Sequence, residues 1–472
     1  MSFQSLHFLV FALAVFTANA LLLRRLAWRK NMLLAASYYF YMCWDWRFAG
    51  LLLAVAAVNY LAARKIEEAA DGAGRKGWLV LALTACLGVL GFFKYANFFI
   101  DSTGRLLAGL GFHADLPTLS MLLPIGVSFF TFQGIAYTID VYRRQQRAVT
   151  DFRDFALFIA FFPTVLCGPI TRGRQLLHQF AAPLPYRAEA AQEGFFLILR
   201  GLVKKVFFAD VLALHIVNPA FDQPGDYGSF FLIVAVIAYS FQIYMDLSGY
   251  TDMVRGISRT LGFELPENFD RPYQARSVSN FWQRWHTSMS SFFRDYLYFG
   301  IGGSKKGNVY INLLVTFVAI GMWHGAGWNF VVYGLLHGSI VGLERCFRNH
   351  ESELGLGAIV RTRLYAVFAI AATFMFVAFS RILFRSDELD AAGAFAQALW
   401  RNGSMQTPFP TIGLAALVGA VLLHYVPKSW VAQAGSAFTK SPAPVQACAT
   451  LVVMLGALAA SPGASSFVYF RF

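Results

Sequence analysis

Apolar stretches of the length needed to cross a lipid bilayer recur along almost the whole chain, separated by short polar segments. A crossing helix needs about 20 such residues. The pattern therefore predicts membrane-spanning segments near residues 4–23, 31–45, 48–63, 77–100, 118–140, 155–171, 192–217, 228–248, 308–325, 327–346, 362–384, 409–426 and 444–460. Several of these are short, so we expect some tilted or re-entrant pieces and about ten to twelve full crossings.

One long segment, residues 251–307, interrupts this pattern with polar and aromatic sequence. Pro266 and Pro272 disfavour helix in LPENFDRPY (265–273), because a proline restricts the residue before it. Ser277 or Ser279 is then a candidate helix N-cap. Apolar side chains follow at three- and four-residue steps, namely Phe281, Trp285, Met289, Phe292, Phe293 and Tyr296. This spacing predicts an amphipathic helix over 277–300, suited to the cytoplasmic membrane surface.

The composition supports an all-α polytopic membrane protein. The 472 residues are 57% hydrophobic and only 14% charged, against about 25% charged residues in soluble domains. We expect one membrane domain over 1–472, because no repeat, linker or soluble domain stands out. The net charge of +13 is scattered over short loops, which argues against nucleic-acid binding. Five dispersed cysteines without CxxC spacing indicate neither a zinc site nor a disulfide framework.

Basic loops predict the orientation of the chain, because Lys and Arg collect on the cytoplasmic side. The loops at 24–30, 64–76 and 143–147 are basic, and 251–307 holds eight Lys or Arg against five Asp or Glu. We therefore place these loops in the cytoplasm and the Asp45-Trp46-Arg47 link outside. Residues 4–23 lack a preceding basic stretch, unlike a secretory signal. They predict a retained span whose N-terminus lies outside the cytoplasm.

Two histidine segments, Trp285-His286 and Trp323-His324-Gly325, are the leading candidates for chemistry. An ionisable residue at membrane depth is costly, and it usually marks a functional site. Small residues follow His324, so we expect the helix to break there, and such breaks line cavities. Burial favours the neutral imidazole, which can act as a general base. His286 is equally consistent with a structural role.

The other polar residues in apolar sequence have weaker claims. Asp246 and Asp252 need partners, for which Arg255 or Arg259 is the candidate, and we favour structural ion pairs. His337 and His424 are expected to be packing residues with satisfied hydrogen bonds. His286, His324 and His337 lack compact metal-ligand spacing, so no metal site is predicted.

At these residues the chain resembles the membrane-bound O-acyltransferase family, within the branch of alginate O-acetyltransferase membrane subunits and their relatives in cellulose and peptidoglycan acetylation. The matching segments are LPIGVSFFTFQGIAYTIDVYR (123–143), FFPTVLCGPI (161–170), QIYMDLSGYTDMVRGISRTLGFELPENFDRPY (242–273), SVSNFWQRWHTSMSSFFRDYLYFGIGG (277–303), GMWHGAGWNFVVYGLLHG (321–338), LFRSDELDAA (383–392) and FVYFRF (467–472). The central blocks are the long and specific ones, and they define a histidine core at 241–338.

The resemblance implies a ring of tilted helices around a central funnel whose floor holds the histidines. His324 stands at the position of the family's histidine in WHG and is then the general base, while His286 assists or orients. The tunnel candidates are Trp285, Trp323, Asp246, Asp252, Arg284 and Trp328. The implied donor is a cytoplasmic acyl thioester such as acetyl-CoA, with no bound cofactor. The implied partners are a periplasmic acetyltransferase, a polysaccharide synthase and export complex, and membrane lipids. The implied function is O-acetylation of an exported polysaccharide of alginate or cellulose type.

Two alternatives stay open at this point. The first is a transporter of an acyl carrier or glycan that makes no bonds, in which the histidines and Asp246 and Asp252 relay protons. The second keeps the enzyme and changes its cargo to D-alanine or a long acyl chain.

Overall fold

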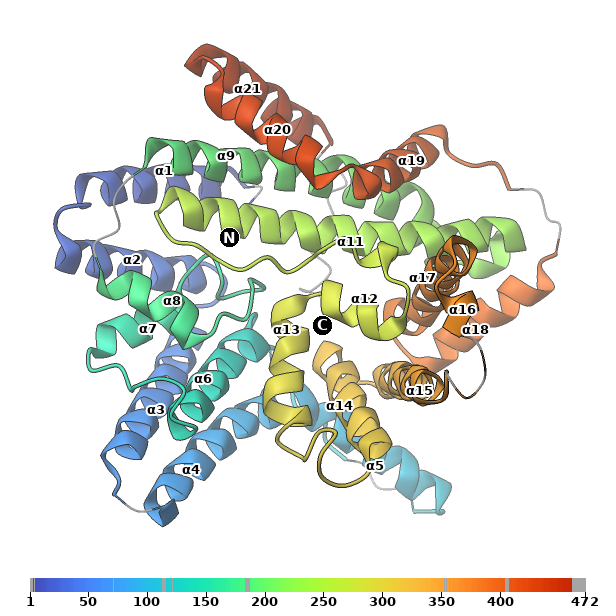
Figure 1. Cartoon of the computed structure of the whole chain (residues 1–472), viewed down its shortest axis with the longest axis horizontal. Helices are drawn as coiled ribbons and strands as arrows, with labels where there is room; N and C mark the ends of the chain where they lie inside the picture. Colours follow the sequence, from blue (N-terminus) through green and yellow to red (C-terminus); the bar gives the residue numbers. More distant parts are fainter. Residues whose placement is uncertain are drawn as a thin grey trace. The chain divides into compact units, whose positions relative to one another are not determined.

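A computed structural model describes residues 3, 5–70, 72–112, 116–120, 122–182, 187–351, 353, 355, 357–403 and 407–460, with side chains as far as Ala457. Every regular element in these ranges is a helix, as predicted (Figure 1). The chain packs as two compact units. Unit 1 comprises Met1–Phe195 and Val254–Pro266, and unit 2 comprises Phe196–Met253 and Glu267–Phe472. The single domain stays a prediction, and the segment 467–472 lies outside the described residues.

Several helices are long and apolar enough to cross a membrane. In the described ranges there are five, namely α3 (Phe48–Glu68), the composite of α4 (Gly72–Leu90), η1 (Gly91–Tyr95) and α5 (Ala96–Gly109), α11 (Ser229–Thr260), α15 (Trp328–His350) and α17 (Arg363–Arg385). The pair α19 (Thr411–Tyr425) and α20 (Lys428–Lys440) bends by 96° and is a candidate sixth span. Shorter apolar helices are α1 (Leu6–Leu21), α14 (Val309–His324) and α21 (Ala443–Ala460). The protein is a multi-pass membrane protein with several short or broken spans, and the number of full crossings stays a prediction.

Unit 1 is built around α3, α4 and α6 (Val127–Tyr142), which lie side by side in Figure 1. Asn59 joins α3 to α6, because its Oδ1 accepts a hydrogen bond from the Thr138 hydroxyl at 2.8 Å. A Cβ at Gly134 would overlap the Asn59 amide, so glycine permits this close approach. The rest of the unit consists of α1, α2 (Leu26–Met42), η1, α5, α7 (Phe152–Ala160), α8 (Gly173–Ala181), the start of α9 (Ala188–Val203) and the end of α11.

Two predicted spans in unit 1 are wrong in extent. The span 118–140 begins as helix only at Val127, after Pro124 and a left-handed Gly126 (φ +77°). The span 155–171 is helical only to Ala160, and residues 161–172 form a buried irregular segment. Pro163 and Pro169 lack the backbone N–H that a helix interior needs, so the apolar run cannot stay helical. These residues are apolar because they are buried inside the protein, and apolar composition alone does not distinguish them from a crossing segment.

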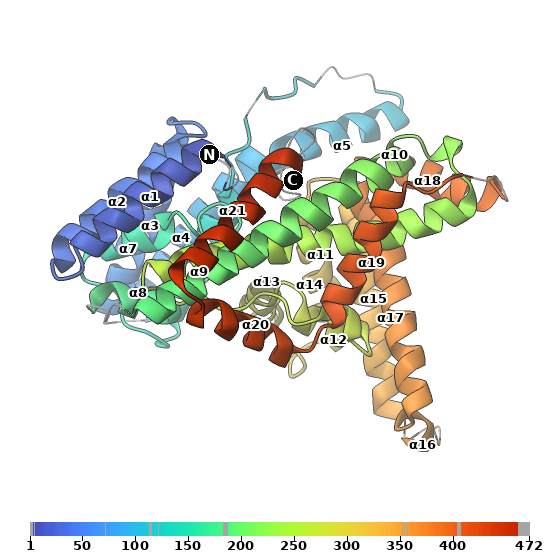
Figure 2. The same cartoon turned by 90° about the horizontal axis from the view of Figure 1, so that it is seen from above.

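Unit 2 holds the remaining helices. From η2 to α13 these are η2 (Lys204–Asp210), η3 (Ala213–Val217), α10 (Asn218–Asp222), η4 (Pro224–Asp226), η5 (Pro272–Gln274), α12 (Val278–Arg284) and α13 (Thr287–Phe292), and the later ones are η6 (Phe293–Tyr298), α16 (Gly357–Val360) and α18 (Leu389–Arg401). In Figure 2, α15 and α17 run together to α16 at their tip. The backbones of α14 and α15 touch, since a Cβ at Gly321 would overlap the Phe330 carbonyl and one at Gly334 would overlap the Phe317 carbonyl. This pair carries His324.

Candidate active site

His324 is the last residue of α14, and the predicted helix break at this position is confirmed. Gly325 takes an extended conformation and ends the helix, and α15 begins three residues later at Trp328. A Cβ at Gly325 would overlap the Phe330 ring, so the tight return of the chain depends on glycine. The imidazole of His324 is buried, with 3% of the residue exposed. The break therefore holds this ring inside unit 2.

A small cavity adjoins the His324 ring. Its volume is about 10 Å³, and its walls are Ile243, Trp285, His324, Tyr333, Arg381 and Phe384. The Phe384 ring lies edge-on to the imidazole, with 5.0 Å between centroids. A space of this size holds about one water molecule. Substrates therefore need the surrounding aromatic side chains to move before they reach the histidine.

His286 lies at a second break, between α12 and α13. Its backbone is left-handed (φ +45°, ψ +55°), a conformation that costs a non-glycine residue on the order of 1 kcal/mol or more. Asn268 stabilises the turn beyond it, because its carbonyl accepts from the Thr287 N–H at 3.0 Å and its Oδ1 accepts from the Ser288 N–H at 3.1 Å. Burial lowers the pKa of His286 to about 4, so the ring is neutral at physiological pH.

The amphipathic helix predicted over 277–300 is therefore wrong in its continuity. Of the two candidate N-caps, Ser277 is the one that caps α12, and it accepts a hydrogen bond from the Asn280 N–H. Ser279 instead donates to the Glu344 carboxylate at 2.8 Å. Five of the six stripe residues, Phe281, Trp285, Met289, Phe292 and Phe293, are buried inside unit 2. The stripe packs within the protein, which the three- and four-residue spacing does not distinguish from a membrane-surface helix.

Trp323 lies between the two histidines. The His286 ring meets the Trp323 indole edge-on with 5.7 Å between centroids, and the Trp323 and His324 centroids are 4.8 Å apart. Trp285 belongs to the same group, because its indole lines the His324 cavity. The structure thus brings together four of the predicted site residues, from two different breaks in the chain.

Two predicted tunnel residues lie apart from this group. Arg284 is half-buried and donates hydrogen bonds to the Asn280 Oδ1 and the Asp270 carbonyl. Trp328 is 53% exposed at the start of α15. Neither residue lines the cavity of His324, so their assignment to a tunnel stays a prediction.

Asp246 and Asp252 form structural ion pairs, as favoured, although their partners differ from those expected. Lys205 lies between Asp246 and Asp210, at 2.8 Å from each carboxylate. Asp252 pairs with Arg200 and, at 2.7 Å, with Lys204. Arg259 pairs with Glu193 instead. The basic partners come from another helix, where sequence spacing gives no signal.

Arg381 is a site residue that the sequence analysis missed. It lines the His324 cavity and is 2% exposed. Its guanidinium lies over the Trp285 indole, 4.5 Å from the centroid, and donates to the Tyr273 hydroxyl and the Ser240 carbonyl. It forms no ion pair with any acid in the described ranges. An arginine inside the apolar run 362–384 is itself a signal of function.

The two remaining membrane histidines differ. His337 accepts from the Trp282 N–H at 3.2 Å, and its other nitrogen is 2.9 Å from the Ser380 hydroxyl, so the predicted packing role is confirmed. His424 is also buried, which confirms its predicted packing, and no described residue forms a hydrogen bond with either ring nitrogen. Its ring lies 4.9 Å from the Tyr244 centroid and 5.1 Å from that of Tyr273. His424 therefore packs with Tyr244, Tyr273 and Trp285 in one group of rings, the aromatic cluster.

Within the described ranges, no three His, Cys, Asp or Glu side chains converge as ligands of a metal ion. All five cysteines lie in the described ranges, and none of them forms a disulfide. The chemistry available at this site is that of a buried imidazole, a buried guanidinium and aromatic walls. Such a set can move a proton and stabilise a developing negative charge.

The region that contains this site is similar in sequence to known proteins. Residues 141–386, which include His286, His324 and Arg381, match the model of the membrane-bound O-acyltransferase family. The probable alginate O-acetylase AlgI of Azotobacter vinelandii is 37% identical over 382 residues, covering 80% of this chain and 73% of that protein. The peptidoglycan O-acetyltransferase of Helicobacter pylori is 34% identical, covering 77% and 72%. A teichoic acid D-alanyltransferase of Bacillus subtilis is 27% identical, covering 57% and 70%.

Proposed function

The chain belongs to the membrane-bound O-acyltransferase family and is an O-acyltransferase, and from this premise we propose that it transfers acetyl groups from a cytoplasmic thioester such as acetyl-CoA. The acceptor is a hydroxyl group on the outer side of the membrane, on an exported polysaccharide or on a partner protein that acetylates one. The names of the similar proteins, alginate O-acetylase and peptidoglycan O-acetyltransferase, support this substrate class. One observation carries the proposal: a buried histidine and an arginine without an acidic partner line the same cavity.

The proposed reaction begins at the His324 imidazole. The neutral ring accepts the proton of the acceptor hydroxyl while that oxygen attacks the thioester carbonyl carbon. The resulting tetrahedral intermediate collapses by breaking the C–S bond, and the imidazolium returns the proton to the leaving thiolate. The products are an acetyl ester and a free thiol, so every atom and proton is accounted for. Holding both reactants at the ring supplies the proximity that the step requires.

Arg381 stabilises the negative charge of this intermediate. The carbonyl oxygen becomes an oxyanion during the attack, and a fixed donor in a water-poor site lowers the energy of that state. The Arg381 guanidinium is held by Tyr273 and Ser240 beside the His324 cavity. Its charge is not neutralised by a carboxylate in the described part of the chain, which leaves it available to a transient anion.

His286 is a positioning residue in this scheme. Its neutral ring meets the Trp323 indole, which in turn lies next to His324. In this scheme His286 orients the WHG turn and transfers no proton. The order of the basic loops supports an inner-membrane location with a periplasmic N-terminus and a cytoplasmic donor. A periplasmic acetyltransferase and the polysaccharide synthase and export complex are then the proposed partners.

The test is an acetyl-transfer assay with the purified full-length chain, radiolabelled acetyl-CoA and an alginate or peptidoglycan fragment as acceptor. His324→Ala should lower the rate by roughly 10² to 10⁴, the usual value of a general base. His350→Ala is the matched control, because His350 is exposed and distant in the chain from the cavity residues. Thermal unfolding of each variant checks that the protein is folded.

The same assay separates the alternatives. Wild-type protein that moves no label from acetyl-CoA, in the presence of each acceptor and of membrane extract, would contradict the proposal and favour a transporter. Transfer from an acylated carrier protein that acetyl-CoA does not compete with would favour D-alanyl chemistry, which the Bacillus subtilis relative carries in its name.

A further inference from the structure

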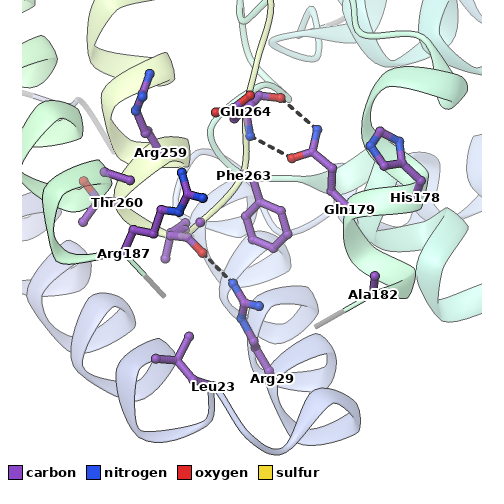
Figure 3. Close-up of a pocket in the computed structure, with 13 residues that line it drawn as sticks. Leu23, Arg29, His178, Gln179, Ala182, Arg187, Arg259, Thr260, Phe263 and Glu264 are labelled. Carbon is purple, nitrogen blue, oxygen red and sulfur yellow. Dashed lines mark hydrogen bonds between the residues drawn. The ribbon is translucent and has the colours of Figure 1, made fainter. Parts of the chain in front are cut away.

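Unit 1 contains a larger pocket, distinct from the His324 cavity and formed by residues far apart in the sequence (Figure 3). Its volume is about 330 Å³. Arg29 of α2, Gln179 of α8, Arg187 before α9 and the turn that follows α11 form its walls. Gln179 ties α8 to this turn, because its amide exchanges two hydrogen bonds with the Glu264 backbone, at 2.8 and 3.0 Å. The pocket walls are therefore fixed by hydrogen bonds.

The pocket is electropositive. Three arginines line it, Arg29, Arg187 and Arg259, against one acid, Glu264. Arg259 pairs with Glu193, which leaves two arginines without an acidic partner in the described residues. Figure 3 shows the side chains of Arg29 and Arg187 reaching toward the space beside the Phe263 ring. A ligand in that space would meet two positive charges.

Arg29 is the unusual member of this group, because only 2% of it is exposed. Its Nε donates to the Asn19 Oδ1 at 2.8 Å, a second nitrogen donates to the Leu261 carbonyl, and the guanidinium lies over Phe263 at 4.9 Å. The other terminal nitrogen has no hydrogen-bond partner among the described residues. Burial of a charge without a counter-ion is costly. An anion that enters the pocket would offset this cost.

The segments that line the pocket indicate which kind of anion binds there. Leu23 of its lining follows α1, whose Leu6, Leu13 and Leu21 side chains are more than 60% exposed, as expected of a lipid-facing helix. The basic segment 24–30, which includes the start of α2, is predicted to be cytoplasmic. Basic pockets between helices on that face commonly bind phosphate groups of anionic lipids. Arginine also matches phosphate geometrically through paired hydrogen bonds.

We propose that the pocket lined by Arg29, Arg187 and Arg259 binds a phosphate group at the cytoplasmic side of the membrane. The phosphate comes either from an anionic phospholipid headgroup or from a soluble phosphorylated ligand such as the nucleotide part of coenzyme A. Only the second source rests on the proposed acetyl-CoA donor. The pocket itself is defined within unit 1 and requires no activity.

The experiment measures binding to purified full-length protein in detergent with two probes, phosphatidylglycerol and adenosine 3′,5′-bisphosphate. Phosphatidylcholine, whose phosphate charge is balanced by its choline cation, serves as the zwitterionic comparison. Arg187→Glu is the main variant, because this side chain is exposed and the reversal should not disturb folding. Arg187→Lys retains the charge. Arg174→Glu on α8 is the matched control, an exposed arginine outside the pocket lining.

We expect one of the two phosphate probes to bind the wild type and Arg187→Lys, and Arg187→Glu to weaken it by about tenfold or more, the scale of one charged hydrogen bond. Arg174→Glu should retain wild-type affinity. Phosphatidylglycerol binding identifies a lipid site, and bisphosphate binding identifies a soluble ligand. Equal affinity of wild type and Arg187→Glu for both probes, or equal losses in Arg187→Glu and Arg174→Glu, would overturn the proposal. Acetyl transfer plays no part in these measurements, so failure of the proposed function leaves them intact.

Discussion

At the residue scale, two histidines with similar sequence contexts have different surroundings. His324 ends a helix and faces a cavity that also contains Arg381. His286 occupies a left-handed backbone position at a break between two short helices. Backbone strain of this kind persists only where the surrounding structure holds it. The Trp323 indole contacts both rings, so a change at His286 reaches His324 through packing.

The pH dependence of stability tests the burial of His286. Its folded pKa is about 4, against about 6.5 in an unfolded chain. Between these values the unfolded state binds more protons, so stability is constant above pH 6.5 and falls as the pH drops toward 4. The loss is roughly 2 kcal/mol at pH 5. Unfolding of wild type and His286→Gln in one detergent should show a shallower pH dependence in the variant, and parallel curves would contradict the buried neutral ring.

Arg381→Gln tests the oxyanion role. We expect kcat for acetyl transfer to fall roughly 10²- to 10³-fold with little change in KM, because the lost interaction forms mainly in the transition state. Arg381→Lys should restore part of the rate, since it keeps the charge and loses the planar fork.

Tyr273→Phe is the matched control for Arg381, because it removes one of the two hydrogen bonds that hold the guanidinium and retains the positive charge and the bond to Ser240. Equal losses of kcat in Arg381→Gln and Tyr273→Phe would mean that Arg381 acts only by supporting the aromatic cluster.

At the scale of elements, the close packing of α14 against α15 positions His324. The two helices approach so closely that a side chain at Gly334 would meet the backbone of Phe317 and Val318. Small residues at such crossings let helix backbones touch within a membrane. The turn at Gly325 then fixes the imidazole relative to α15.

Gly334→Leu should therefore separate α14 from α15 and disable the site. Overpacking of this kind costs on the order of 1–3 kcal/mol, so we expect a lower unfolding temperature together with a loss of acetyl transfer. Gly393→Leu on α18 is the matched control, because nothing lies within 4 Å of a Cβ there. A fully active, equally stable Gly334→Leu protein would contradict the proposed positioning.

The sequence predicted the elements better than their interruptions. Apolar runs identified the positions of α3, α11, α15 and α17, because length and hydropathy suffice for an isolated crossing helix. The break at His286 was missed, since the three- and four-residue spacing continues across it unchanged. The partners of Asp246 and Asp252 were also missed, because Lys205 and Arg200 lie some forty to fifty positions away in sequence. Tertiary contacts decide such features, and they leave no local pattern.

The site itself was half predictable. His286, Trp285, Trp323 and His324 follow from the cost of ionisable groups in apolar sequence and from the family resemblance, and the structure places them together. Arg381 carried the same signal within an apolar run and was overlooked. The hydrogen bonding of His424 could not be predicted from the sequence. It depends on its neighbours in space, Tyr244 and Tyr273, whose rings pack against it while no described residue bonds its nitrogens.

At the scale of the whole molecule, the proposed transfer needs donor and acceptor on opposite sides of the membrane. The basic segments predict which side is which, because segment 64–76 includes the end of α3 and the Asp45-Trp46-Arg47 link precedes its start. Arg47 is paired with Asp45 at the end of α3 that is predicted to lie outside, so the link carries little net charge. Positive charge is retained in the cytoplasm, and the orientation of α3 therefore fixes that of its neighbours along the chain.

Cysteine labelling of Trp46→Cys and Ala73→Cys tests this orientation, since both positions are exposed. Cys43, Cys346 and Cys448 are first replaced by serine, while Cys86 and Cys167 are buried and should stay unreactive. In spheroplasts, a membrane-impermeant maleimide should label Trp46→Cys at once and Ala73→Cys only after permeabilisation. Full labelling of Ala73→Cys after permeabilisation shows that the thiol is reachable. The reverse pattern would put the basic loops outside, and a cytoplasmic thioester would then approach the His324 cavity from the side assigned to the acceptor.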